Sequence, residues 1–388
     1  MGNSESEAGS TYIRPTDNYS YQLATETHFV HPTSTASFQL PEKNQNQILL
    51  KSAYHGVWSM TYPHGVPPEP RVGQCHVFDS QRDELIIAYG SDASGKCLND
   101  AWILNLKTFN WRNLSRGLLS PRQYPSATLV GRKMYIFGGA SNLDFFGDLH
   151  CVDIDTGVLT VIQTTGQAPS PRTSPVIFYF DNSIFIWSGF DGNTDGDLYM
   201  VPATGGEWRV VKQEMTDRAA PAFCHFGDDL YVFGSSKGNG LLSFNRKTLQ
   251  FDIVNCTGPA PLPELTHPSL VAADEYLFVI GGEATLRYMY LFALDVRRRW
   301  WFAFHVRPDN NSVILTDGIV SKIGLFMMPR EHSVAVAYSR SEKELISVMG
   351  SRLLNPTPVF KIAIGEALGV LHLRSDMYDM FQRDMAQQ

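Results

Sequence analysis

The chain has 388 residues, of which 43% are apolar and 18% charged, and its formal net charge is −7. This mildly acidic balance fits a soluble body with a large core and excludes a Lys/Arg-rich nucleic-acid surface, so we expect no nucleic-acid partner. No apolar run approaches the roughly 20 residues of a membrane span, and the first forty residues are polar, so we expect neither a signal peptide nor a transmembrane helix.

The chain begins with a motif that carries chemistry. Residues 1–6 fit the acceptor pattern for N-myristoylation, in which Gly2 becomes the terminal residue after methionine removal and Ser6 fills the last required position. The following Ser-, Thr-, Asn- and Gln-rich segment predicts a flexible polar tail over residues 1–46. One acyl chain anchors weakly and reversibly, so this lipidation candidate implies only a weak peripheral membrane association.

Beyond the tail, short apolar runs end in glycines at intervals of about 46–50 residues, which is typical of a repeat architecture. The glycines that mark these runs are Gly90, Gly138, Gly189, Gly234, Gly281 and Gly350. The last interval is longer than the others. Each unit is too small to bury its own apolar face, so we expect the six units to stack into one body.

Other residues fall into register when the units are aligned on the glycines. Five units carry an upstream arginine, in four cases after a proline: Arg71, Arg122, Arg172, Arg218 and Arg330. Downstream, a small or polar pair such as Asn99-Asp100 opens a third strand, and a large residue such as Trp111 or Trp208 lies on a fourth. Four short strands per unit predict an antiparallel blade.

The segment Pro329 to Ser333, the glycine pairs and the trailing tryptophans together resemble the kelch motif. This resemblance implies an all-β protein, with a six-bladed kelch-type β-propeller over residues 47–373. The segment Val57 to Thr61 is the expected outer strand of the last blade, contributed from the N-terminus so that the ring has no exposed edge. A seventh, degenerate blade from residues 37–62 is the alternative count.

Two segments lie outside the regular period. An insertion of about 20 residues, at 307–328, precedes the sixth blade, and its apolar content predicts either a lid over the channel or a docking surface. At the other end, residues 374–388 carry Met377, Phe381 and Met385 at helical spacing, which predicts a short C-terminal helix packed on the propeller. A helix that docks on a partner is the alternative.

In a four-stranded blade, the loop before the first strand and the loop between the second and third strands lie on the same face. We expect this loop-rich face to bind a protein partner. Phe145-Phe146 is an aromatic pair within it and a candidate hot spot, unless one ring packs over the neighbouring blade. The repeated arginines can either contact a partner or make fixed bonds between blades. The candidate contact residues are Phe145, Phe146, Arg122, Arg172, Asp191, Arg330 and Arg352.

A metal site would need a cluster of His, Cys, Asp or Glu side chains. The closest pattern is the pair of dipeptides Cys75-His76 and Cys224-His225 on first strands of opposite blades. Successive strand residues point to opposite sides, so at most one member of each dipeptide faces the channel. We therefore predict no metal, no cofactor and no catalytic residue.

The five cysteines are odd in number and scattered over separate units, which is typical of a reducing compartment and predicts a cytoplasmic protein. The most consistent function is a non-enzymatic scaffold or adaptor whose partner the sequence does not identify. The alternative is a propeller-based metalloenzyme, similar to copper-radical carbohydrate oxidases or to iron-dependent specifier proteins. Stoichiometric copper or iron in the purified protein would favour this alternative.

Overall fold

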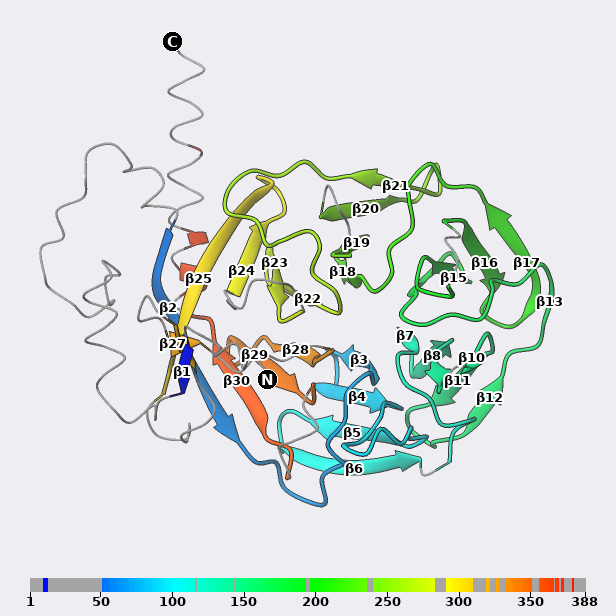
Figure 1. The fold of residues 1–388 in the computed structure, drawn as a ribbon, viewed down its shortest axis with the longest axis horizontal. Helices are drawn as coiled ribbons and strands as arrows, with labels where there is room; N and C mark the ends of the chain where they lie inside the picture. Colours follow the sequence, from blue (N-terminus) through cyan, green and yellow to red (C-terminus); the bar gives the residue numbers. More distant parts are fainter. Residues whose placement is uncertain are drawn as a thin grey trace, which may run out of the picture.

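The described part of the chain folds into six antiparallel blades arranged around a central axis (Figure 1). This is the predicted six-bladed β-propeller. The computed structural model describes residues 10–12, 51–115, 117–142, 144–192, 196–235, 240–282, 291–309, 319–321, 326–327, 333–350, 356–365, 367–369, 371–372 and 379. Every structural statement below refers to these residues.

The first four blades follow one another along the chain. Blade 1 contains β3 (Cys75–Asp79), β4 (Glu84–Ala88), β5 (Ala101–Asn105) and β6 (Asn110–Ser115). Blade 2 contains β7 (Ser126–Val130), β8 (Lys133–Phe137), β11 (Leu149–Asp153) and β12 (Leu159–Val161). Blade 3 contains β14 (Val176–Phe180), β15 (Ser183–Trp187), β16 (Leu198–Pro202) and β17 (Gly206–Val211), with β13 (Thr164–Gly166) added in parallel outside β17. Blade 4 contains β18 (Ala222–Phe226), β19 (Asp229–Phe233), β20 (Leu241–Asn245) and β21 (Gln250–Ile253).

The last two blades are joined through the N-terminal strand. Blade 5 contains β22 (Ser269–Ala273), β23 (Tyr276–Ile280), β24 (Leu291–Asp295) and β25 (Trp300–Pro308). Blade 6 contains β28 (Ala335–Ser339), β29 (Glu344–Val348), β30 (Val359–Ala363) and β2 (Lys51–Thr61). The first part of β2 also runs parallel to β25, so blades 5 and 6 form one eight-stranded sheet.

Strand β2 closes the ring as predicted. It pairs antiparallel with β30, with Val57 opposite Ala363 and Thr61 opposite Val359. Because residues 51–61 form a single strand of blade 6, they do not build the seventh blade that was the alternative count.

The core lies at the seams between neighbouring blades. The second strands are mostly apolar after their first residue because a blade packs against each of their faces, and every residue of β15 and β23 is buried. At the seam of blades 1 and 2, for example, Ile86 and Ile103 pack with Met134 and Ile136 in one cluster. Adjacent blades thus share their cores, as the small size of each unit requires.

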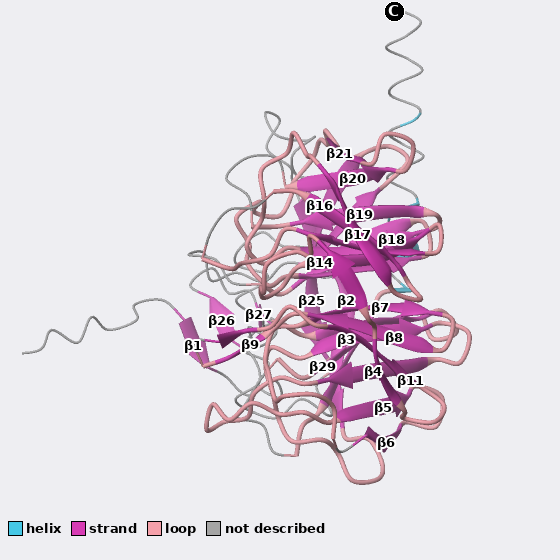
Figure 2. Ribbon diagram, turned by 90° about the vertical axis from the view of Figure 1, so that its right-hand side faces the viewer, coloured by secondary structure: helices cyan, strands magenta, loops and turns pink. Residues whose placement is uncertain are grey.

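The two faces of the ring differ. Figure 2 shows long loops on one side, hereafter the loop face, and short turns on the other, hereafter the turn face. A small sheet of β1 (Ser10–Tyr12), β26 (Ile319–Ser321) and β27 (Phe326–Met327) lies on the loop side and includes part of the 307–328 insertion. The rest of that insertion lies outside the described residues, so its role as lid or docking surface stays a prediction.

The end of the chain turns from strand to helix soon after β30. Residues 365, 367–369, 371, 372 and 379 are helical. Leu368 and Leu371 pack into the core of blades 5 and 6, so the beginning of this helix is held by the propeller. Most of the predicted 374–388 segment lies outside the described part of the chain.

Most neighbouring blades are joined by a backbone hydrogen bond whose acceptor is the carbonyl oxygen at the repeated arginine position. In each pair the amide of one blade donates to a carbonyl oxygen of the next. The pairs are Gly90 with Arg122 at 2.9 Å, Gly139 with Arg172 at 2.8 Å, Gly189 with Arg218 at 2.9 Å, Ser235 with Leu265 at 2.7 Å and Gly350 with Arg71 at 3.2 Å. The last of these closes the ring from blade 6 to blade 1. The fifth blade lacks the arginine, and a leucine carbonyl takes its place.

Glycine is required where two blades approach so closely. Gly138 has a φ of +76°, and a Cβ atom added there would lie 2.3 Å from the carbonyl oxygen of Arg172 in the next blade. We predict that Gly138→Ala lowers the free energy of unfolding by about 3 kcal/mol, because backbone strain adds to the clash at the seam. Urea unfolding followed by tryptophan fluorescence measures this loss.

Gly131 provides the matched control. Its φ is +58° but no atom lies within 4 Å of an added Cβ. Gly131→Ala should therefore cost only about 1 kcal/mol of backbone strain. Equal losses in the two variants would contradict the assigned role of the seam contact.

Candidate functional site

The four repeated arginines that the structure describes, Arg71, Arg122, Arg172 and Arg218, are buried. Arg122 is 1% exposed. Its Nη1 donates to the carbonyl oxygen of Gly138 at 3.0 Å and to Asp148 Oδ1 at 2.8 Å. Arg71 has the same arrangement, with bonds to the Tyr89 carbonyl at 3.0 Å and to Asp100 at 2.6 Å. Each guanidinium thus fixes the glycine turn of its own blade.

Arg172 lies in the equivalent place in blade 3 and is also 1% exposed. It donates to the Ser188 carbonyl at 3.0 Å and to Ser170 Oγ at 2.6 Å. Half-buried Asp191 accepts a hydrogen bond from Ser170 and lies 3.8 Å from Arg172. These contacts replace the expected partner contacts of Arg122 and Arg172, because side chains without solvent exposure cannot reach a bound protein.

A buried polar chain crosses the seam of blades 1 and 2. Asp148 also accepts from His150 Nδ1 at 2.9 Å, and the Tyr89 hydroxyl lies 2.8 Å from His150 Nε2. Burial raises the pKa of Asp148, but the bonds from His150 and Arg122 outweigh it and leave that pKa below its usual value. Burial lowers the pKa of His150. A neutral imidazole that donates to Asp148 and accepts from Tyr89 satisfies the whole chain.

Phe145 and Phe146, the aromatic pair of the loop face, make different contacts. They lie at the end of the hairpin formed by β9 (Ala140–Ser141) and β10 (Asp144–Phe145). The ring of Phe146 covers the Arg122 guanidinium at 4.0 Å. Phe145 packs edge-to-face on Phe190 of blade 3, with ring centroids 6.1 Å apart. One ring therefore does pack over the neighbouring blade.

Phe190 is the functional candidate that sequence reasoning missed. It follows Gly189 directly and is 50% exposed, which is unusual for a phenylalanine in an ordered loop. The available signal was its place just after a glycine pair, on the same face as Phe145. Of the other candidates, Gly2, Arg330 and Arg352 lie outside the described residues.

A second missed feature narrows the channel at the loop face. Residues just before the first strands hold left-handed backbone conformations, with φ between 48° and 56°. These residues, hereafter the collar, are Tyr124, Ser174, His267 and Ser333. Each collar amide donates to a carbonyl of another blade: Tyr124 to Gly73 at 2.6 Å, Ser174 to Tyr124 at 2.8 Å, His267 to Ala220 at 3.0 Å and Ser333 to His267 at 3.2 Å. These bonds form two runs, one from Ser174 through Tyr124 to Gly73 and one from Ser333 through His267 to Ala220.

The channel has two unequal parts. Beside the collar the cavity measures about 150 Å³, and at the turn face it widens to about 830 Å³. His76 and His225 line the wide part, whereas Cys75 packs in the core of blades 1 and 2, where burial raises its pKa to about 12. Cys224 also belongs to the lining of the wide part, and Cys75 to that of the narrow part, so the lining does not separate the two members of either dipeptide. Over the described ranges, no three His, Cys, Asp or Glu side chains gather as a metal site.

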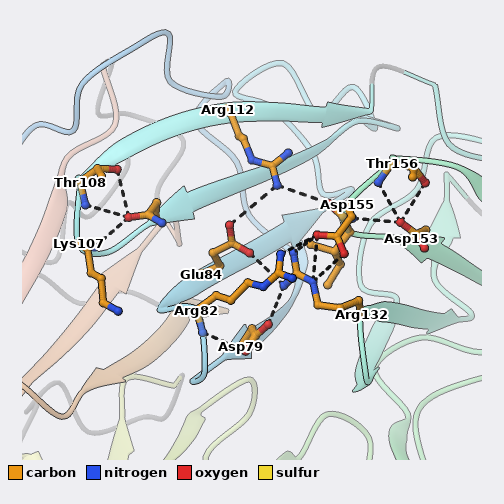
Figure 3. Close-up of polar contacts among 12 residues, drawn as sticks. Asp79, Arg82, Glu84, Lys107, Thr108, Arg112, Arg132, Asp153, Asp155 and Thr156 are labelled. Carbon is orange, nitrogen blue, oxygen red and sulfur yellow. Dashed lines mark hydrogen bonds and ion pairs between the residues drawn. The ribbon is translucent and has the colours of Figure 1, made fainter.

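Fixed ion pairs cover the turn face at the seam of blades 1 and 2 (Figure 3). Arg132 lies at the centre, with Nη1 2.6 Å from Asp79 and Nη2 2.7 Å from Asp155. Arg82 reaches the same Asp155 at 2.8 Å. These arginines and carboxylates neutralise one another across the seam between the two blades, so we assign them a structural role.

Known proteins share this architecture. A family model described as the KLHDC2/KLHL20/DRC7 Kelch-repeats domain matches residues 38–234, about half of the chain. The chain belongs to the kelch-repeat family. The glycine pairs, the buried arginines and the outer tryptophans of this kelch propeller are therefore features of its framework.

Curated relatives are similar over part of the kelch propeller. The chain is 28% identical over 265 residues to the leucine-zipper-like transcriptional regulator 1 homolog of Drosophila melanogaster, covering 61% of this chain and 27% of that protein. It is 33% identical over 151 residues to acyl-CoA-binding domain-containing protein 4 of Arabidopsis thaliana, covering 38% and 22%. It is 30% identical over 157 residues to host cell factor 1 of Homo sapiens, covering 35% and 8%. The chain thus spans about a quarter or less of each relative's length.

We predict that Arg122→Met destabilises the kelch propeller by about 3 kcal/mol, because it removes three hydrogen bonds, to Ser120, Gly138 and Asp148, and leaves Asp148 without its cation. The exposed Arg209, on an outer strand, provides the control, and Arg209→Met should change stability by less than about 0.5 kcal/mol. Thermal unfolding of both variants decides the matter. An Arg122→Met protein as stable as the wild type would mean that the buried arginine is not structural.

A pH effect follows from His76, whose Nε2 accepts a bond from the Val336 amide at 3.4 Å across the seam of blades 6 and 1. Burial lowers its pKa from 6.5 to about 4. The unfolded chain therefore binds a proton at His76 before the folded protein does. The stability contributed by neutral His76 is complete above pH 6.5 and is lost as the pH falls toward 4.

We predict that His76→Gln, which keeps an acceptor, flattens the fall of the urea midpoint between pH 7 and pH 4.5. The exposed His64 is the control, and His64→Gln should retain the wild-type profile. Identical profiles for wild type and His76→Gln would refute this assignment.

Proposed function

We propose that this kelch propeller is a non-enzymatic scaffold that binds a protein partner through its loop face. The family and the regulatory names of relatives such as host cell factor 1 support a protein-binding role. The five cysteines are free thiols, which supports a reducing, cytoplasmic location. Among the described residues, no helix combines the length and apolar character needed to cross a bilayer.

The exposed Phe190 carries the proposal. A half-exposed aromatic ring offers a large apolar area at a small entropic cost, which is typical of interface hot spots. Its backbone is fixed, because Phe190 exchanges hydrogen bonds with Thr173 at 2.8 and 2.9 Å. Phe145 supports the ring from the next blade. The surface is thus already ordered before the partner binds, so binding carries little entropic cost for ordering this loop.

The metalloenzyme alternative predicts a different outcome for the same purified protein. Stoichiometric copper or iron by elemental analysis would favour an enzyme. A scaffold binds its partner whether or not metal chelators are present.

We predict that Phe190→Ala weakens capture of the partner at least about tenfold, since hot-spot truncations cost 2 kcal/mol or more. The measurement is quantitative affinity purification with the full-length chain as bait. Val158 on the turn face is 60% exposed and serves as the matched control, so Val158→Ala should capture the same partners as the wild type. Equal loss in both variants, or loss in neither, would argue against the loop face.

A further inference from the structure

The wide half of the channel has the dimensions of a ligand site. Its volume of about 830 Å³ lies within the range of roughly 300–1,000 Å³ that is usual for small-molecule pockets. Five of the six blades line it. The part beside the collar has a volume of only about 150 Å³, so a ligand of this size fits the larger part, which the turn-face residues line.

The walls of this cavity leave apolar side chains in contact with solvent. Phe78, Leu129 and Phe226 come from three different blades, and each is only partly buried although it lines the cavity. His225 also lines the cavity and is exposed within it. An apolar ligand would remove this area from water, which is favourable in proportion to the area covered.

The charged side chains of the lining are two carboxylates, Asp83 and Asp274, and one cation, Arg340. Each carboxylate already has a lysine, Lys107 at 3.1 Å from Asp83 and Lys343 at 2.8 Å from Asp274, so the donors that remain favour an acceptor on the ligand. His76 accepts the Val336 amide at Nε2, so its neutral ring carries the proton on Nδ1 as a donor. At the mouth, Arg340 is 83% exposed and lies 3.9 Å from Asp274. That carboxylate is already bound more closely, by Lys343 and by the Tyr338 hydroxyl, each at 2.8 Å. Arg340 therefore shares Asp274 with Lys343 and is the more distant of its two cations, so its exposed guanidinium can also meet an anion at the rim.

We propose that the turn-face half of the channel binds a small organic anion with an apolar body, such as an aromatic or aliphatic carboxylate or sulfonate. The body occupies the space between Phe78 and Phe226, and the anionic group meets Arg340 at the rim. This site is separate from the protein-binding surface around Phe190, which lies on the opposite face.

Two matched dyes test the proposal on the full-length protein. Anilinonaphthalene sulfonate is an apolar anion, and N-phenyl-1-naphthylamine is its uncharged analogue. We expect saturable fluorescence enhancement by both dyes at one site per chain. His225→Trp fills the cavity and should weaken both dyes at least about tenfold. Arg340→Gln should weaken the sulfonate by about fivefold and leave the neutral dye unchanged.

The controls are chosen away from the cavity. Val158→Trp adds the same bulk to an exposed turn, and Arg209→Gln removes an exposed arginine from an outer strand; neither should alter dye binding. Thermal unfolding verifies that all variants are folded, since partly folded states also bind the sulfonate dye. Absence of saturable binding to the folded wild type, or equal binding by wild type and His225→Trp, would overturn the proposal. If Arg340→Gln leaves the affinity for the sulfonate dye unchanged, the proposed contact between the anionic group and Arg340 is wrong.

Discussion

Each described arginine of the repeats, at positions Arg71, Arg122, Arg172 and Arg218, forms hydrogen bonds in two directions. Its guanidinium donates to the turn carbonyl of its own blade at 3.0 Å, as Arg122 does to Gly138, while its backbone carbonyl accepts the glycine amide of the preceding blade, as from Gly90. The glycine is needed because the chain turns with positive φ and passes within contact distance of the next blade. The recurring arginines and the recurring glycines are therefore two halves of one interaction.

This interaction determines where function can lie. A buried guanidinium is tolerated only when it is paired and fully hydrogen-bonded, and Asp100 and Asp148 supply that pairing in blades 1 and 2. The arginines are thereby withdrawn from the loop face, which leaves neighbouring loop residues such as Phe190 as the exposed groups. The framework also lines the channel, because collar residues border its smaller part at the loop face and the first strands line its larger part at the turn face.

The blades and the closing strand could be predicted because their patterns are local. Apolar runs of fixed length between turn residues predict strands, and Val57 to Thr61 had the pattern of an outer strand with no blade of its own. Whether a side chain points into the core or toward a partner is not determined by the neighbouring sequence. The recurrence of Arg122 and Arg172 was consistent both with contacts to a partner and with fixed bonds in the interior. Only the positions of Asp148 and of the glycine turn in the folded protein distinguish the two.

Some signals were present but not used. A proline three residues after the arginine recurs at Pro125, Pro175 and Pro221, and it marks the segments that lead into the first strands. Left-handed backbone before proline is rare, so propensity alone would not have suggested the collar. The exposure of Phe190 depends on how blades 2 and 3 meet, which no single repeat contains.

Amide hydrogen exchange at the seams tests the central claim most directly. If the arginine-to-glycine bonds hold the ring closed, the amides of Gly90, Gly139 and Gly189 should exchange only through global unfolding, with a free energy of opening equal to that of the whole propeller. Exchange of these amides within seconds under native conditions, while the second strands stay protected, would show that the blades are held together by their apolar cores alone.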